Sequence, residues 1–182
     1  MDKPHELPHP LQRLGAAVLT VSDTRTMESD TSGALARARL LALGHEVWVH
    51  EIVRDERALI SARVLALVDE ARIDLVFLTG GTGMTRRDVT PDAITDLVMP
   101  SDRRVEGFGE LFRSLSYAEI GSATIQTRAD AWILRGKLVF VVPGSTGAVR
   151  LAFDRILDEQ LDFEFRPCNF VALLPRIRGE RD

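Results

Sequence analysis

Residues 73–93 read IDLVFLTGGTGMTRRDVTPDA, and this stretch decides the fold. Its first six residues are nearly all apolar, as expected of a short parallel strand that is buried on both faces. Glycines follow at positions 80, 81 and 83. Because glycine adopts positive φ angles and lets bare N–H groups approach a ligand, such a loop at the carboxyl end of a strand favours phosphate binding.

A helix is predicted directly after this loop. Thr90 is a suitable N-cap, Pro91 suits the first helical position, and Asp92 complements the positive end of the helix dipole. Asp88 would then remain in the loop, where it can face the ligand. The alternative is a glycine-rich turn that only connects the strand to the helix.

Two common phosphate motifs do not match this loop. A Walker A loop ends in Gly-Lys-Ser or Gly-Lys-Thr, whereas Gly83 is followed by Met84 and Thr85. A dinucleotide fingerprint that starts at Gly81 needs a third glycine where Arg86 stands. The sequence therefore argues against a P-loop NTPase and against a nicotinamide-dependent oxidoreductase.

Length and composition predict a single soluble domain with ample core, because the chain has 182 residues, 45% of them hydrophobic. Residues 1–12 are expected to form a loose N-terminal arm, residues 13–175 the domain, and residues 176–182 a tail. The net charge of −4 argues against nucleic-acid binding. Cys168 is the single cysteine, and no apolar run approaches the roughly 18 residues of a membrane span. We therefore expect a cytoplasmic protein without a membrane segment.

The chain alternates strand and helix patterns, which predicts an α/β fold. Strands are expected at residues 14–21, 45–53, 73–78, 131–134 and 138–142. The alternating polar and apolar residues of 45–53 place that strand near a sheet edge. Helices are expected from about 30–32 to 43, from 56 to about 71, and from about 91 onward. A further helix ends at 117, with its start loosened by the glycines at 107 and 109, and the loop at 143–147 opens a last helix that ends at 157.

Polar loops follow several of these strands. Residues 22–26 read SDTRT, residues 79–83 read TGGTG, and residues 143–147 read PGSTG. The carboxyl ends of parallel strands meet at one edge of a sheet, and ligands bind at that edge in open α/β folds. We therefore expect these loops to form one binding site.

From about residue 12 to residue 174 the chain resembles the MoaB/MogA family of molybdenum cofactor biosynthesis proteins. The resemblance rests on the motifs TGGTG (79–83), RDVTP (87–91), GFGE (107–110) and PGS (143–145). The runs LSYAEIG (115–121), QTR (126–128) and RPCNF (166–170) are closer to the MoaB branch. The resemblance implies a three-layer α/β/α sandwich with a mostly parallel sheet, assembly into trimers or hexamers, and binding of molybdopterin, a pterin with a dithiolene and a terminal phosphate. Other proteins of this biosynthesis are implied partners.

The resemblance also implies a reaction, in which the molybdopterin phosphate is adenylylated by ATP with Mg²⁺ and pyrophosphate leaves. It makes Asp55 and Asp88 the catalytic carboxylates that hold Mg²⁺, a suitable pair because hard cations prefer oxygen ligands. Strand-end position and resemblance together predict these molybdopterin and phosphate ligands: Ser22, Asp23, Thr79, Gly80, Gly81, Thr82, Gly83, Gly144 and Ser145. Arg25 is a further phosphate candidate, with an ordinary surface arginine as the alternative.

Other interpretations of these residues stay open. Asp55 could cap the following helix, and Asp88 could pair with Arg86 or Arg87. The main rival function is a protein of the same fold that holds or delivers molybdopterin without chemistry.

Residues outside these loops are expected to have structural roles. His45 and His50 are expected to be solvated strand histidines on opposite faces, and Cys168 a packed, inert thiol. The apolar C-terminal segment around Phe163 to Leu174 shows no clear amphipathic helical repeat. It would either join neighbouring chains or pack back on its own domain.

Overall fold

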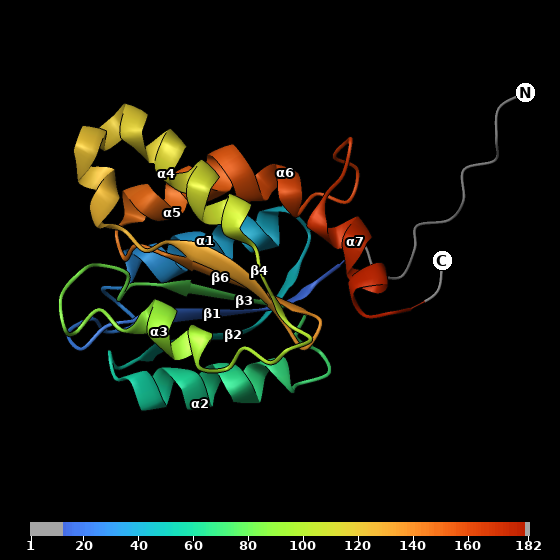
Figure 1. Ribbon diagram of the computed structural model, residues 1–182, viewed down its shortest axis with the longest axis horizontal. Helices are drawn as coiled ribbons and strands as arrows, with labels where there is room; N and C mark the ends of the chain where they lie inside the picture. Colours follow the sequence, from blue (N-terminus) through green and yellow to red (C-terminus); the bar gives the residue numbers. More distant parts are fainter. Residues whose placement is uncertain (1–12, 181–182) are drawn as a thin grey trace, which may run out of the picture.

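A six-stranded sheet lies at the centre of the computed structural model, which describes residues 13–180 (Figure 1). The strand order is β2-β1-β3-β6-β5-β4. Strands β2, β1, β3 and β6 are parallel, whereas β5 pairs antiparallel with both β6 and β4. The strands are β1 (Gly15–Val21), β2 (Glu46–Val53), β3 (Leu75–Thr79), β4 (Arg103–Arg104), β5 (Asp130–Leu134) and β6 (Lys137–Val142). The arm expected for residues 1–12 lies outside the described residues.

Helices cover both faces of this sheet. Figure 1 shows α1, α4, α5 and α6 on one face, with α2 and α3 on the other, so the predicted three-layer sandwich with a mostly parallel sheet is confirmed. The helices are α1 (Thr31–Ala42), α2 (Arg57–Val68), α3 (Thr90–Thr95), α4 (Glu106–Ile120), the 3₁₀ turn η2 (Gly121–Gln126), α5 (Thr146–Ala152), the π-helical η3 (Phe153–Leu157), α6 (Asp158–Gln160) and α7 (Phe170–Ile177). Within residues 13–180, none of them is long and apolar enough to cross a membrane.

A separate hydrophobic core lies on each side of the sheet, and β1 contributes to both. Ala16 and Val18 pack into the core beneath α1, α4 and α5, whereas Ala17 and Leu19 pack into the core that holds α2 and α3. Because both faces are covered, every residue of β1 is buried. Strand β2 ends the sheet, and none of its residues is fully buried, as its alternating sequence predicted.

The start of α3 differs from the prediction. Val89 occupies the N-cap position and Thr90 is the first helical residue, so the prediction that Thr90 caps the helix is wrong. The side chain of Thr90 is needed elsewhere. Its hydroxyl donates to the carbonyl of Gly80 at 2.9 Å, and its N–H donates to the carbonyl of Gly81 at 3.0 Å. The helix start therefore fixes the shape of the glycine loop.

The glycines of the GFGE motif lie inside α4, which begins at Glu106. The prediction that these glycines loosen the start of the helix is wrong, because Gly109 allows close packing between α4 and a neighbouring segment. A Cβ atom at Gly109 would lie 2.6 Å from the carbonyl oxygen of Ala129, so only glycine lets α4 approach the chain that enters β5.

The C-terminal segment forms the helix α7, which the sequence analysis did not predict. Asn169 caps it by accepting the N–H of Ala172 at 2.8 Å. Val171 and Leu174 are buried in the core beneath α4 and α5, so the segment packs back on its own domain. The prediction of a packed Cys168 is also wrong, since that residue is exposed.

His45 is not solvated, as the sequence analysis expected, but buried directly before β2. Its Nδ1 accepts the N–H of Leu14 at 3.2 Å, and its Nε2 lies 3.0 Å from the carbonyl oxygen of Leu161. Both contacts suit the neutral ring with the proton on Nε2. Burial lowers the pKa of His45, because a charged imidazolium is disfavoured away from water.

We expect this histidine to make the free energy of unfolding depend on pH. The unfolded chain takes up the proton near pH 6.5, whereas the folded chain resists it, so stability is present above that pH and is lost as the pH falls below it. The slope for one such group is at most about 1.4 kcal/mol per pH unit. Urea denaturation at several pH values from 5 to 8 measures it. His45→Gln should flatten the slope, and an unchanged slope would contradict this role.

Candidate functional site

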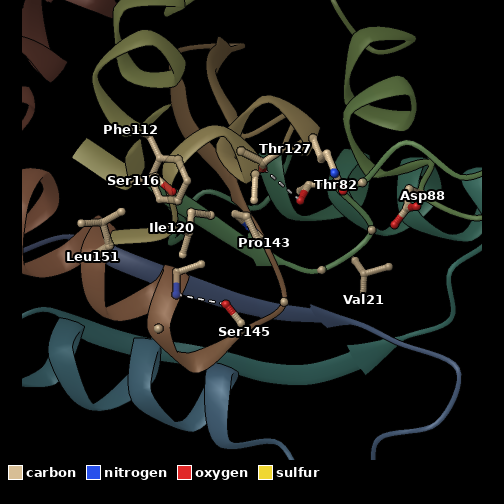
Figure 2. Close-up of a pocket in the computed structure, with 18 of the residues that line it drawn as sticks. Val21, Thr82, Asp88, Phe112, Ser116, Ile120, Thr127, Pro143, Ser145 and Leu151 are labelled. Carbon is tan, nitrogen blue, oxygen red and sulfur yellow. Dashed lines mark hydrogen bonds between the residues drawn. The ribbon is translucent and has the colours of Figure 1, made fainter. Parts of the chain in front are cut away.

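The polar loops at the carboxyl ends of β1, β3 and β6 border one cavity of about 500 Å³ (Figure 2). The glycine loop contributes Gly80 to Gly83 and, further along, Asp88. The loop after β6 contributes Pro143 to Ser145, and the loop after β1 contributes Arg25. The structure thus brings together segments that the sequence analysis expected to meet at this edge.

The backbone of the glycine loop requires glycine at two positions. Gly80 has a φ of 110° and Gly81 a φ of 63°, both in the region that side chains rarely adopt. A Cβ atom at Gly80 would lie 2.3 Å from the carbonyl oxygen of Val21. In the described part of the chain, the N–H groups of Gly81 and Thr82 have no hydrogen-bond acceptor. They are therefore available to a ligand.

Arg128 completes the support of this loop, together with Thr90. The N–H of Arg128 donates to the carbonyl of Thr82 at 2.9 Å, and its Nε donates to the carbonyl of Gly83 at 3.0 Å. Its guanidinium also donates to the carbonyl of Asp88 and pairs with Asp92 at 2.8 Å. Because Arg128 is 45 residues from Gly83, sequence spacing gave no sign of this contact.

Asp88 lies half-buried at the end of the loop. Its Oδ2 accepts the N–H of Thr85 at 2.9 Å and the hydroxyl of Thr85 at 2.6 Å. Burial alone would raise the pKa of Asp88, but the hydrogen bonds from Thr85 and from the N–H of Gly83 outweigh it and lower the pKa. Within residues 13–180, Asp88 forms no salt bridge, so the pairing with Arg86 or Arg87 that the sequence left open is absent. Asp88 is therefore a fixed carboxylate that stays charged.

Asp55 lies beside the glycine loop, outside the cavity lining. It does not cap α2, because Glu56 occupies the N-cap position. Its Oδ1 atom is buried and has no hydrogen-bond partner among the described residues. A Cβ atom at Gly81 would lie 3.0 Å from this oxygen, so the two residues are neighbours. Burial raises the pKa of Asp55, and the negative charges of Asp88 and Asp23 raise it further.

Three other predicted ligands have side chains that lie outside the cavity lining. Ser22 accepts the N–H of Arg25 at 3.1 Å and so shapes the loop after β1. Asp23 forms an ion pair with Arg87 and accepts the N–H of Asp55 at 3.3 Å. The hydroxyl of Thr79 is occupied, since it donates to the carbonyl of Pro143 at 2.9 Å. These three side chains hold the loops in place and do not line the cavity.

The loop after β6 reaches the cavity through Gly144 and Ser145. A Cβ atom at Gly144 would lie 3.2 Å from the Cα of Gly80, so the two loops are in close contact. The hydroxyl of Ser145 caps α5 by accepting the N–H of Ala148 at 3.1 Å, as Figure 2 shows.

An apolar wall closes the opposite end of the cavity, and the sequence analysis did not predict it. Figure 2 shows Phe112, Ile120 and Leu151 at this end, far from Asp88. Phe112, Ser116 and Ile120 recur every four residues along α4, so one helix face lines the cavity. That spacing was readable in the sequence, but it is equally typical of a helix that only faces the core.

The donor set suits a Mg²⁺ ion. Magnesium is commonly held by one or two carboxylates together with the phosphates of its substrate. Asp55 offers a buried oxygen without a partner, and Asp88 offers a charged carboxylate that affects the pKa of Asp55. Within residues 13–180, no group of three or more histidine, cysteine, aspartate or glutamate side chains is arranged to hold a metal. Two carboxylates would leave the other positions around such a cation to water or to the oxygens of a phosphate.

The fold and the cavity define an α/β protein whose glycine-rich and polar loops surround a cavity at the carboxyl edge of a parallel sheet. Comparison with known proteins agrees with this class. The family described as "Probable molybdopterin binding domain" matches residues 17–162. The chain is 46% identical over 154 residues to molybdenum cofactor biosynthesis protein B of Escherichia coli, which covers 85% of this chain and 89% of that protein. The chain belongs to the MoaB family of molybdenum cofactor biosynthesis proteins.

Further relatives support the same assignment. The protein of the same name from Bacillus subtilis is 47% identical over 145 residues, covering 79% of this chain and 84% of the relative. A crystal structure of molybdenum cofactor biosynthesis protein B has a TM-score of 0.77 at 39% identity, covering 92% of this chain and 95% of the other. The tungsten cofactor synthesizing protein MoaB from Pyrococcus furiosus has a TM-score of 0.74 at 33% identity, covering 91% and 98%.

Proposed function

We propose that this protein binds molybdopterin and adenylylates its terminal phosphate with Mg²⁺ and ATP, releasing pyrophosphate. The observation that carries the proposal is the division of the cavity. Free N–H groups and Asp88 lie at one end, and the apolar side chains of Phe112, Ile120 and Leu151 lie at the other. Molybdopterin is divided in the same way, because its flat pterin ring lies at one end and its charged phosphate at the other. The family of the chain supports this choice of ligand.

The proposed reaction is a nucleotidyl transfer. An oxygen of the molybdopterin phosphate attacks the α-phosphorus of ATP, and the bond from this phosphorus to the oxygen that bridges to the β-phosphorus breaks. Pyrophosphate leaves with the electron pair of that bond. Such transfers depend chiefly on positioning and on neutralisation of charge. The N–H groups of Gly81 and Thr82 would hold the phosphate, while Asp55 and Asp88 would bind Mg²⁺. When bound, Mg²⁺ supplies positive charge to the phosphate oxygens.

The alternative is a protein of the same fold that holds or delivers molybdopterin without chemistry. Both functions require the same pterin site. They differ in whether ATP is consumed.

Pyrophosphate release separates these two functions. The full chain is incubated with molybdopterin, ATP and Mg²⁺, and pyrophosphate is measured over time. We expect release that requires all three reactants and stops when the metal is chelated. Tight binding of molybdopterin without pyrophosphate would favour the delivery protein, and absence of binding would contradict both.

We also propose that the protein is a homo-oligomer, a trimer or a hexamer. The apolar side chains of α7 do not support this, because they are buried in their own domain. The support lies in α4 and η2, where Tyr117 is 62%, Ile120 55% and Ile125 75% exposed. Burial of such side chains between subunits stabilises an assembly by about 25 cal/mol per Å².

Light scattering on the full chain tests the assembly. We expect a mass of about three or six times the 20.2 kDa of one chain. Ile125→Asp places a charge in the proposed contact and should shift the mass towards the monomer. A wild-type mass of one chain would contradict the proposal.

A further inference from the structure

Arg25 has a distinct place in the cavity. Of the described residues that line it, Arg25 alone carries a positive side chain, whereas Asp88 and Glu119 are acidic. A phosphate monoester carries up to two negative charges and is bound most strongly by charged donors. Backbone N–H groups supply only partial charges, so the lining offers one full charge to such a ligand.

The guanidinium of Arg25 is held by several groups. Its Nη1 donates to the hydroxyl of Ser32 at 2.6 Å, and its Nη2 donates to the carbonyl of Gly144 at 3.1 Å. Nη1 also lies 3.6 Å from Oδ1 of Asp30. Arginine has more N–H donors than these contacts use, and its side chain is 31% exposed. The remaining donors are therefore available to a ligand in the cavity.

Asp30 is itself fixed, because its carboxylate is fully buried. Its Oδ2 accepts the hydroxyl of Thr20 at 2.6 Å and lies 3.2 Å from Nε2 of His50. Its Oδ1 accepts the N–H of Gly33 at 3.0 Å, which caps α1. The carboxylate thus links β1, α1 and β2 and places a negative charge behind Arg25.

The same cluster orients the loop after β6. The carbonyl of Gly144 accepts a hydrogen bond from Nη2 of Arg25 and a second one, at 2.8 Å, from the hydroxyl of Ser32. In a trans peptide the C=O and N–H point in opposite directions, so the N–H of Ser145 points away from Ser32. Arg25 therefore both contributes charge to the cavity and fixes the orientation of the Gly144 carbonyl.

We infer that Arg25 binds the terminal phosphate of the ligand and that Asp30 and Ser32 are positioning residues for Arg25. The inference rests on the proposed function for the identity of the ligand. It makes Arg25 a further donor to the phosphate that the N–H groups of Gly81 and Thr82 would hold, because Gly144, which Arg25 contacts, lies against Gly80 of the same loop.

The test compares two ligands, molybdopterin and molybdopterin whose terminal phosphate has been removed by a phosphatase. Binding of each to the full-length chain is measured by calorimetry under anaerobic conditions. Arg25→Gln should weaken binding of the phosphorylated ligand about 10- to 100-fold and leave binding of the dephosphorylated ligand unchanged. Arg25→Lys keeps the charge but loses the two-sided contact, so we expect an intermediate loss.

Arg39→Gln is the matched control. Arg39 lies on α1 with a side-chain exposure of 30%, close to that of Arg25, and it pairs with Asp154 and Asp158 away from the cavity. The Arg39→Gln substitution should leave the affinity for both ligands unchanged. Circular dichroism of each variant confirms the fold, and Arg25→Lys provides the measurement if Arg25→Gln does not fold.

Asp30→Asn tests the positioning role, because asparagine preserves the helix cap and removes the charge. We expect weaker binding of the phosphorylated ligand alone, whereas a general loss of structure would weaken both ligands. Equal losses for both ligands in Arg25→Gln, or no loss, would overturn the inference while leaving the proposed function intact. If the wild-type chain binds neither ligand, the proposed function fails and the inference fails with it.

Discussion

Asp88→Asn is expected to lower the rate of pyrophosphate release by about 100-fold or more while the fold is retained. The stabilisation that a bound cation gives to developing charge is worth several kcal/mol, and a neutral amide binds Mg²⁺ far less well than a carboxylate. The fold should survive because Asp88 forms no salt bridge within residues 13–180 and its side chain accepts only local hydrogen bonds from Thr85 and Gly83. Steady-state release of pyrophosphate at saturating ATP is the measurement.

Asp96→Asn is the control for this variant. Asp96 lies at the end of α3, is exposed, and pairs with Arg57 at 2.5 Å on the surface. An exposed salt bridge of this kind contributes little to stability, so its loss should not change the rate. A wild-type rate in Asp88→Asn would remove Asp88 from the proposed site, whereas equal losses in both variants would indicate a general effect on α3.

Gly81→Val is expected to abolish binding of molybdopterin and to lower the free energy of unfolding by roughly 1–3 kcal/mol. The φ of Gly81 is 63°, which a β-branched residue adopts only with strain. Its Cβ would lie 2.3 Å from Oγ1 of Thr90, the residue that holds the loop. The new side chain would also cover the free N–H groups beside it. Calorimetry with molybdopterin and urea denaturation measure the two effects.

Gly44→Val separates backbone strain from loss of the site. Gly44 has a φ of 84° behind α1, and nothing lies within 4 Å of a Cβ placed there. Its substitution should cause strain without any loss of pterin affinity. If Gly81→Val folds and binds like the wild type, the glycine loop is only a connector between β3 and α3.

The strands and the glycine loop could be predicted because each depends on neighbouring residues. The apolar run of β3 is short and is followed at once by glycines, and this local combination favours a strand that ends in a loop. Contacts between distant residues were harder to predict. Arg128 supports a loop 45 residues away, and the buried His45 contacts the carbonyl of Leu161, which is distant in the sequence. Threonine often caps helices, but the hydroxyl of Thr90 donates to the carbonyl of Gly80 instead.

The sequence likewise predicted some residues of the candidate site correctly and others not. Gly80 to Gly83, Asp88, Gly144 and Ser145 line the cavity, whereas Ser22, Asp23 and Thr79 support its loops from behind. Residue type and position at a strand end cannot separate these roles, because a hydroxyl or carboxylate suits a ligand and a loop N–H equally well. The apolar wall on α4 was missed because a face that lines a cavity and a face that meets the core have the same spacing.

The contacts made by Thr90 and Arg128 determine which charge the glycine loop accepts. Between them these residues donate to the carbonyl oxygens of Gly80, Gly81, Thr82 and Gly83. The backbone oxygens of residues 80–83, which would attract a cation or repel a phosphate, are therefore already hydrogen-bonded, and the backbone of this stretch offers its N–H groups to a ligand. Because hydrogen bonds within the chain hold the loop in this shape, an anion that bound there would cost the loop little conformational entropy.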